Sequence, residues 1–361
     1  MLLRKPTYRQ WELRPEGTSI LQPVKIAIIG CGLITDLAHL PASLKSSKIE
    51  VVSLMDQELE RAKTLKRKYG CRAAACSDLD RALDKVEAVL IATPNHSHSK
   101  VSLKALERGL PVLVEKPLTT SYHEATELVE ISKARKTFIS VGFVTRHFPV
   151  VRFMKRLLDE GYLGKVERFH FEFGTPSGWA SVSGYTLDRA LSGGGVLMVN
   201  GSHYIDRMLY WFGYPEKFSF ADDSLGGVEA NCKASVQYHD GVEGTMFFSR
   251  SMDLRNSFTM RTDKYDVEIP LAEASEITLR PRELDGAVMT MKDSAQPRYS
   301  DYFLAQIDEF ADAVRGQSEP SVNGESGAIS LKLIEELYGC RTQLAEPWAW
   351  YRKNRKAAHS L

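Results

Sequence analysis

Residues 24–35 read VKIAIIGCGLIT, an apolar run that ends at Gly30 and is followed by a second glycine at position 32. A short apolar run that stops at a glycine is typical of a parallel strand buried on both faces. The segments that follow alternate between strand-like and helix-like patterns. We expect strands over 49–56, 86–91, 110–114 and 138–142, and helices over 33–45, 58–68, 97–108 and 121–135. Alternation of this kind predicts a doubly wound parallel sheet.

The loop between the first strand and the first helix contains two glycines, Gly30 and Gly32. Glycines at this place let the backbone approach a pyrophosphate, and free N–H groups at a helix start attract its charge. Thr35 occupies the position of the third glycine in the usual fingerprint. Asp56 ends the second strand, where a dinucleotide enzyme places its ribose-binding carboxylate. We therefore predict a dinucleotide site; the alternative is a glycine turn and a surface aspartate in an unrelated α/β protein.

The residues after the second strand bear on the choice of dinucleotide. A carboxylate at Asp56 would repel the 2′-phosphate of NADP, and the next residues, Gln57 and Glu58, supply no cation. This favours NAD over NADP. Arg61 is a nearby cation that keeps NADP as the alternative.

The pattern changes after a predicted helix over 149–164. Longer alternating runs follow over 166–173, 230–238, 242–250 and 265–269, which predicts a second, mostly antiparallel sheet. Another helix is expected after Gly193-Gly194-Gly195, and two helices over about 301–315 and 325–343 close the chain. We divide it into an N-terminal arm (1–22), a Rossmann domain (23–145), a substrate-binding and oligomerisation domain of α+β type (146–345) and a basic tail (346–361).

Composition excludes several classes of protein. The chain has 361 residues, enough for about two domains, and its 47 Lys and Arg nearly balance 46 Asp and Glu. This balance does not favour nucleic acid or an anionic membrane as partner. Five scattered cysteines without a CxxC pair indicate reduced thiols rather than disulfides, and we predict no metal site. Without a recognisable signal peptide or membrane span, we expect a cytoplasmic protein.

Further motifs carry a family resemblance. Ala92-Thr93-Pro94-Asn95-His96-Ser97-His98 follows one strand and Glu115-Lys116-Pro117 the next; Ser192-Gly193-Gly194-Gly195 and Gly201-Ser202-His203-Tyr204-Ile205-Asp206 come later. With these motifs, residues 23–345 resemble the glucose-fructose oxidoreductase and inositol dehydrogenase family, often written Gfo/Idh/MocA. The resemblance implies a Rossmann domain, a C-terminal α+β domain with a large open sheet, a nicotinamide cofactor and a homo-oligomer, either dimer or tetramer.

The resemblance also assigns residues to the cofactor pocket. They are Gly30, Cys31, Gly32, Leu33, Ile34, Asp56, Thr93, Pro94, Asn95, His98, Glu115, Lys116 and Arg146. In this assignment Glu115 supports the pocket. Arg146 also lies where relatives carry substrate-contacting residues, and its alternative role is that of a structural ion-pair partner.

Lys116 is the first catalytic candidate. Hydride transfer to or from a carbinol needs a group that takes the hydroxyl proton. Lys116 follows a strand at its carboxyl end, where ligands bind in open α/β sheets, and a partly desolvated lysine can lose its proton near working pH. The alternative is an exposed loop lysine paired with Glu115.

His203 is the second candidate, and it carries the chain's main departure from the family. In relatives, a histidine at this place acts with an aspartate four residues earlier, on the same helix face; here that residue is Val199. His203 could still donate to a substrate oxygen, or be a core histidine bonded to a backbone carbonyl. Asp206 could partner its ring or be structural.

Other residues lie where relatives contact substrate. The substrate-side candidates are Trp179, Asp188, Asn200 and His203, whose types fit a polyhydroxylated ligand, and Tyr185 could serve as proton donor.

Three functions follow from these residues. The first is an NAD-dependent dehydrogenase or reductase that acts on a secondary hydroxyl or ketone of a sugar, aminosugar, cyclitol or nucleotide-linked sugar. The second is a non-catalytic NAD-binding regulator of sugar metabolism, suggested by Val199. The third is an NAD-recycling glycosidase, in which transient oxidation leaves no net NADH.

Overall fold

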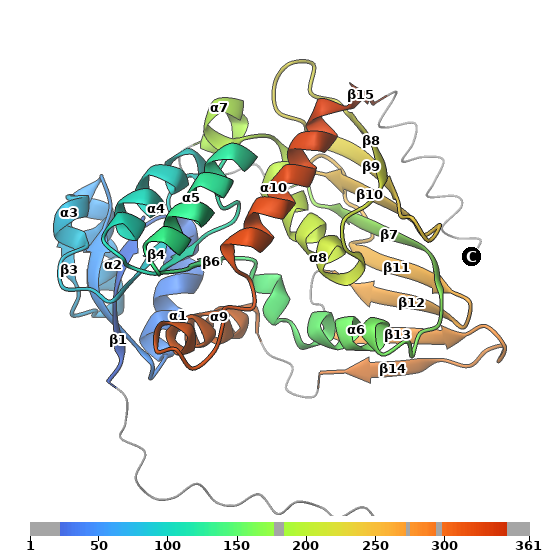
Figure 1. Cartoon of the computed structure of the whole chain (residues 1–361), viewed down its shortest axis with the longest axis horizontal. Coiled ribbons are helices and arrows are strands. Elements are labelled where there is room, and N and C mark those ends of the chain that lie inside the picture. Colours follow the sequence, from blue (N-terminus) through green and yellow to red (C-terminus); the bar gives the residue numbers. More distant parts are fainter. Residues whose placement is uncertain (1–21, 177–183, 272–274, 294–297, 345–361) are drawn as a thin grey trace, which may run out of the picture.

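Two sheets with helices packed on them form the molecule, as the computed structural model shows for residues 22–176, 184–271, 275–293 and 298–344 (Figure 1). The first sheet has six parallel strands in the order β3-β2-β1-β4-β5-β6. Its strands are β1 (Val24–Ile29), β2 (Ile49–Met55), β3 (Ala74–Cys76), β4 (Ala88–Ile91), β5 (Val112–Val114) and β6 (Ile139–Val141). The order reverses at β1, whose neighbours β2 and β4 lie on opposite sides. The doubly wound sheet predicted from the alternation of strands and helices is therefore confirmed.

The helices of this part follow the predicted alternation. Helical backbone runs from residue 33 to residue 45, as expected, but residues Thr35–His39 form a π turn before α1 (Leu40–Lys45). The others are α2 (Leu59–Tyr69), α3 (Leu79–Ala82), α4 (His98–Glu107) and α5 (Tyr122–Ala134). The strand β3 and the helix α3 were not predicted, because segments of three and four residues carry too little periodicity.

The second sheet has nine strands in the order β14-β13-β12-β11-β7-β10-β9-β8-β15. They are β7 (Val166–Gly174), β8 (Lys217–Asp222), β9 (Asn231–Gln237), β10 (Glu243–Ser249), β11 (Ser257–Thr262), β12 (Tyr265–Pro270), β13 (Glu276–Pro281), β14 (Met289–Lys292) and β15 (Arg341–Gln343). Neighbouring strands are antiparallel except for the pairs β7–β10 and β8–β15. The prediction of a mostly antiparallel sheet is confirmed.

Helices α6 (Pro149–Asp159), α8 (Ser202–Phe212) and α10 (Gly324–Gly339) lie along one face of this sheet (Figure 1). The strand alternation explains this, since Phe169 and Phe171 of β7 are buried among apolar side chains. Trp211 and Phe212 of α8 supply the facing layer, and the rings of Phe169 and Phe212 stack at 4.3 Å. The helix predicted over 325–343 is wrong at its end: α10 stops at Gly339, and Arg341 begins the strand β15.

The last two helices return to the first sheet. α9 (Tyr299–Val314) packs against α1 and the π turn before it, where the ring of Phe303 meets that of His39 edge to face at 5.0 Å. α10 packs against α5, and Val141 at the end of β6 donates a 2.9 Å backbone hydrogen bond to Val322. The predicted arm, apart from residue 22, and the predicted tail lie outside the described residues.

Candidate active site

The glycine loop follows β1 directly. Gly30 has φ +96°, and a Cβ atom there would lie 2.4 Å from the carbonyl oxygen of Ala92. Gly32 instead faces open space: apart from its chain neighbours, no atom of the described residues lies within 4 Å of the place where a Cβ would stand. Thr35, at the position of the third glycine, is fully buried and donates from its hydroxyl to the carbonyl of Gly30 at 2.6 Å. The loop is thus closed against the sheet at Gly30 and open outward at Gly32.

Asp56 stands beside this loop at the end of β2. Its two carboxylate oxygens accept the N–H of Cys31 at 2.8 Å and that of Glu58 at 2.9 Å. A carboxylate has about four acceptor positions, so positions remain for further donors. Arg61 pairs with Glu58 through two nitrogens, at 3.0 and 2.7 Å, so that the nearby cation is already neutralised.

The turn after β4 connects the two parts of the molecule. Asn95 donates from its side-chain amide to the carbonyl of Ser192 at 2.9 Å. His98 is buried, and its ring nitrogens lie 2.7 Å from the carbonyl of Pro117 and 2.8 Å from that of Thr93. His98 therefore joins the turn after β4 to the turn after β5, which carries Lys116.

Lys116 begins the turn after β5, and the peptide bond between Lys116 and Pro117 is cis. Its Nζ donates to the main-chain carbonyl of Val199 at 2.6 Å. Burial lowers the pKa of Lys116, the charge of Arg250 lowers it further, and Glu115 acts in the opposite direction. The structure thus gives Lys116 a neutral main-chain acceptor.

Glu115 binds a partner that the sequence did not reveal. His39, at the end of the π turn, lies 2.7 Å from Oε1 of Glu115, and its ring is almost fully buried. Burial raises the pKa of Glu115, but the bond to His39 and the charges of His39, Lys116 and His98 outweigh it, so the pKa is lowered overall. A histidine on the buried face of the first helix indicates a buried polar contact. The sequence does not identify the partner, because Glu115 is 76 positions away.

His203 lies on α8, half-buried, and its ring meets that of Phe143 edge to face at 6.0 Å. Burial lowers its pKa well below the usual histidine range, and the charges of Lys116 and Arg207 add to this. The imidazole is therefore neutral. Its Nδ1 is buried and has no hydrogen-bond partner among the residues that the structure describes.

The neighbours of His203 have other partners. Asp206 accepts two hydrogen bonds from Arg146, at 2.6 and 2.9 Å, and both side chains are buried. Arg146 also stacks on the ring of Tyr210, with 3.9 Å between its guanidinium carbon and the ring centre. Asn200 accepts from Nε of Arg250 at 3.1 Å. Arg146 and Asp206 thus form the structural ion pair that was one alternative for each.

The remaining candidates, Tyr185, Asp188 and Trp179, have different surroundings or lie outside the described residues. The Tyr185 hydroxyl lies 3.5 Å from the Asn95 side-chain oxygen, and burial, followed by the charge of Glu115, raises its pKa. The Asp188 carboxylate accepts the N–H of Ala190 and so caps the short helix α7 (Arg189–Ser192). Trp179 lies outside the described residues.

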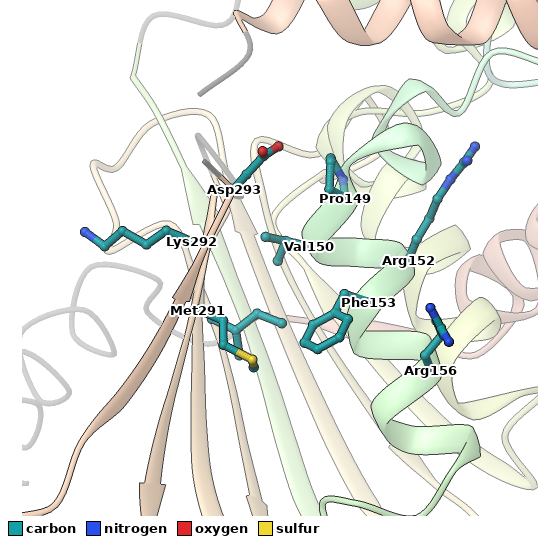
Figure 2. A pocket seen from close by; sticks show the side chains of 9 residues that line it. Pro149, Val150, Arg152, Phe153, Arg156, Met291, Lys292 and Asp293 are labelled. Atoms are coloured by element: carbon teal, nitrogen blue, oxygen red, sulfur yellow. The ribbon is translucent and has the colours of Figure 1, made fainter. Parts of the chain in front are cut away.

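A cavity of about 490 Å³ lies elsewhere, between α6 and the edge of the second sheet (Figure 2). Figure 2 shows Arg152, Phe153 and Arg156 of α6 on one side and Met291 of β14 on the other. The three cationic side chains that line it have partners: Arg152 pairs with Glu309, Arg156 with Glu160, and Lys292 with Glu276. None of the residues predicted for the active site lines this cavity.

Two features are absent from the described residues. No helix among them is long and apolar enough to cross a membrane. No group of three or more His, Cys, Asp or Glu side chains in those same residues could hold a metal ion.

Comparison with known proteins gives matches to both parts of the chain. Residues 24–143 match a family model described as an oxidoreductase family with an NAD-binding Rossmann fold, and residues 151–267 match the GFO/IDH/MocA C-terminal domain. D-glucoside 3-dehydrogenase of Escherichia coli (strain K12) is 25% identical over 339 residues, which cover 88% of this chain and 95% of that protein. Trans-1,2-dihydrobenzene-1,2-diol dehydrogenase of Oryctolagus cuniculus is 31% identical over 66% of this chain and 72% of that protein.

Solved structures share the fold. Levoglucosan dehydrogenase in complex with NADH and levoglucosan superposes with a TM-score of 0.79 at 18% identity, over 88% of this chain and 97% of that one. An inositol dehydrogenase homolog from Azotobacter vinelandii, complexed with NAD⁺, also gives 0.79, at 19% identity over 89% and 95%.

Proposed function

The chain belongs to the Gfo/Idh/MocA family of NAD-dependent oxidoreductases. On that premise, we propose that it transfers hydride between nicotinamide and a carbon that carries a secondary hydroxyl or ketone. In this proposal, Lys116 lies at the reacting oxygen. The substrate in this proposal is a sugar, aminosugar, cyclitol or nucleotide-linked sugar. The observation that carries it is the Lys116 amine, desolvated at the carboxyl end of β5 and held by the carbonyl of Val199.

The residues present fit the dinucleotide. The open face of Gly32 leaves room for a pyrophosphate, and Asp56 has unused acceptor positions for ribose hydroxyls. Thr93, Pro94, Asn95 and Lys116 would hold the nicotinamide end, because they follow β4 and β5 at the same sheet edge. Bound NAD⁺ supplies the hydride acceptor. Asp56, together with the neutralised Arg61, supports NAD over NADP.

In this proposal, Lys116 accepts and donates the proton that accompanies hydride transfer. During oxidation, the neutral amine accepts the hydroxyl proton while the carbon loses hydride, so the substrate loses two electrons and two hydrogens in all. During reduction, the ammonium returns the proton to the ketone oxygen. Lowering the lysine pKa increases the fraction of neutral amine, which is the form required for oxidation.

His203 and Tyr185 supply neutral polar groups. Because its pKa lies far below the usual range, His203 stays uncharged at neutral pH and can form one hydrogen bond with a substrate hydroxyl. Tyr185 keeps its proton because its pKa is raised, so its hydroxyl can donate to a substrate oxygen. Both groups would orient the substrate rather than carry charge.

Val199 was the reason to consider a non-catalytic regulator. Since the main-chain carbonyl at this position gives Lys116 its acceptor, a carboxylate there is not needed to hold the amine. This observation favours the oxidoreductase. The NAD-recycling glycosidase would differ from it in its product.

The test is absorbance at the reduced-nicotinamide band, with NAD or NADP, against a panel of cyclitols, free sugars, aminosugars and nucleotide sugars. Turnover that disappears in Lys116→Ala supports the dehydrogenase. Full turnover in Lys116→Ala contradicts the role of the lysine. Products are also weighed by mass spectrometry, because a recycling glycosidase would cleave its substrate without accumulating NADH.

A further inference from the structure

Glu229 accepts hydrogen bonds from three consecutive backbone N–H groups at the start of the helical segment that carries Val199 and His203. The N–H of Gly195 donates to Oε2 at 2.9 Å, and that of Leu197 donates to Oε1 at 3.0 Å. Between them, the N–H of Val196 donates to the main-chain carbonyl of Glu229 at 2.9 Å. The first amides of a helix have no partner within the helix, so Glu229, which is fully buried, acts as their cap.

Tyr338 of α10 adds a fourth hydrogen bond to this cap. Its hydroxyl donates to Oε1 of Glu229 at 2.7 Å. The glycines before the helix make room for both residues. A Cβ at Gly195 would lie 2.1 Å from the Glu229 carbonyl oxygen, and one at Gly194 would lie 2.1 Å from the Tyr338 hydroxyl. This explains Gly194 and Gly195, the last two of the three consecutive glycines, whereas Gly193 has a positive φ of +83°.

The capped segment leads directly to Lys116. The π turn Leu197–Gly201 begins at one of the amides that Glu229 binds, and the carbonyl of Val199 lies in the middle of this turn. Lys116 donates to that carbonyl from the turn after β5. A shift of the segment would therefore move the acceptor of the lysine amine, and His203 with it.

We propose that Glu229 and Tyr338 are positioning residues for hydride transfer: they fix the start of the helix so that the Val199 carbonyl stays against the amine of Lys116. This rests on the proposed role of Lys116. Neither residue touches the amine, so their effect passes through the backbone of residues 195–199.

The replacement Glu229→Gln tests this with little change in size. An amide group keeps one oxygen acceptor, but its nitrogen cannot accept the N–H that the second carboxylate oxygen now binds. Tyr338→Phe removes only the fourth hydrogen bond. Glu276→Gln is the matched control, because that carboxylate pairs with Lys292 on the far edge of the second sheet.

The experiment measures kcat, KM, the Kd of NAD and the midpoint of thermal unfolding for each variant. It also measures the rate at which Lys116 is acylated by an amine-reactive reagent as a function of pH, by mass spectrometry, which needs no turnover. We expect Glu229→Gln to lower kcat about 10–100-fold, the range seen when supporting partners of metal ligands are removed. Tyr338→Phe should lower it about fivefold. KM and the Kd of NAD should stay within about twofold, and the acylation profile of Lys116 should shift.

The outcomes separate the two proposals. If Glu229→Gln keeps wild-type kcat and an unchanged acylation profile, the positioning role is wrong. It is also wrong if kcat and the midpoint of thermal unfolding fall while KM and the Kd of NAD rise, because a purely structural residue would change all four together. Should Glu229→Gln fail to fold, Tyr338→Phe decides by the same measurements. If the wild type shows no turnover with any substrate, the proposed function fails, whereas the acylation profile still tests the link from Glu229 to Lys116.

Discussion

The Nζ amine of Lys116 donates a 2.6 Å hydrogen bond to the main-chain carbonyl of Val199, a residue 83 positions further along the chain. The bond joins the turn after β5 to the π turn that precedes α8. Because every residue has a backbone carbonyl, the side chain at position 199 is free to be apolar. The lysine thus has an oriented acceptor that adds no negative charge beside it.

Removing the amine should abolish proton transfer and leave the dinucleotide site intact. We expect Lys116→Met to lower kcat about 10²–10⁴-fold, the usual contribution of a general acid or base. The Kd of NAD, measured by fluorescence titration, should change less than about threefold. Lys133→Met is the control, since that lysine is exposed on α5 and pairs with Glu130. Comparable turnover in the two variants would rule out the role of Lys116.

The pH profile should report the charge of Lys116. Burial lowers its pKa, so kcat/KM for oxidation should rise with pH and level off below the normal lysine range. In Val199→Asp, a carboxylate near the amine stabilises the ammonium, and the rise should move to higher pH by about one unit or more. Val199→Asn has similar size and no charge, and its profile should match the wild type. Identical profiles for all three proteins would contradict this assignment.

Replacing the two loop glycines should have different effects on the free energy of unfolding and on the Kd of NAD. In Gly30→Ala the new methyl group would collide with the Ala92 carbonyl at a positive φ, and we expect the free energy of unfolding to fall by about 2–4 kcal/mol. In Gly32→Ala the methyl group has space, so stability should be unchanged. The Kd of NAD should nevertheless rise about tenfold or more, because the methyl group occupies the approach to the pyrophosphate. Urea unfolding and NAD titration of both variants check this.

Replacement by methionine should lower the free energy of unfolding at one buried arginine, Arg146, but not at another, Arg207. Arg146→Met leaves Asp206 as a buried charge without its partner, and we expect a loss of about 3–5 kcal/mol in the free energy of unfolding. Arg207 is fully buried among the rings of Phe148, Tyr204 and Trp211, and its guanidinium nitrogens have no hydrogen-bond partner in the described part of the chain. Arg207→Met should therefore leave stability within about 1 kcal/mol or raise it. Equal losses in urea unfolding would contradict this contrast.

Acid should destabilise the protein through His170. Burial lowers its pKa to about 4, and the charge of Lys233 contributes in the same direction. The unfolded chain binds a proton near pH 6.5, so stability is fully present above that pH and is lost as pH falls from about 6.5 towards 4. His170→Gln should reduce this loss by about 2 kcal/mol between pH 7.5 and 4.5, measured by urea unfolding. His123→Gln, at an exposed position on α5, should not.

Local pattern was sufficient for most of the first sheet. The apolar run before Gly30 and the regular spacing of the following segments specify buried parallel strands, because strand and helix periodicity are properties of neighbouring residues. Short elements such as β3 and β15 escaped prediction because three residues do not define a period. In β15, pairing with β8 decides the conformation.

By itself, the sequence determined the doubly wound sheet, the glycine loop with Asp56, and the placement of Lys116 after a buried strand. These follow from residues that are close in the chain or that end neighbouring strands. Only the tertiary structure decided that the Val199 carbonyl receives the lysine, that Asp206 pairs with Arg146, and that Glu229 caps the helix of His203. Each of these contacts joins residues at least 32 positions apart, and their geometry depends on how the helices pack, which local periodicity does not encode.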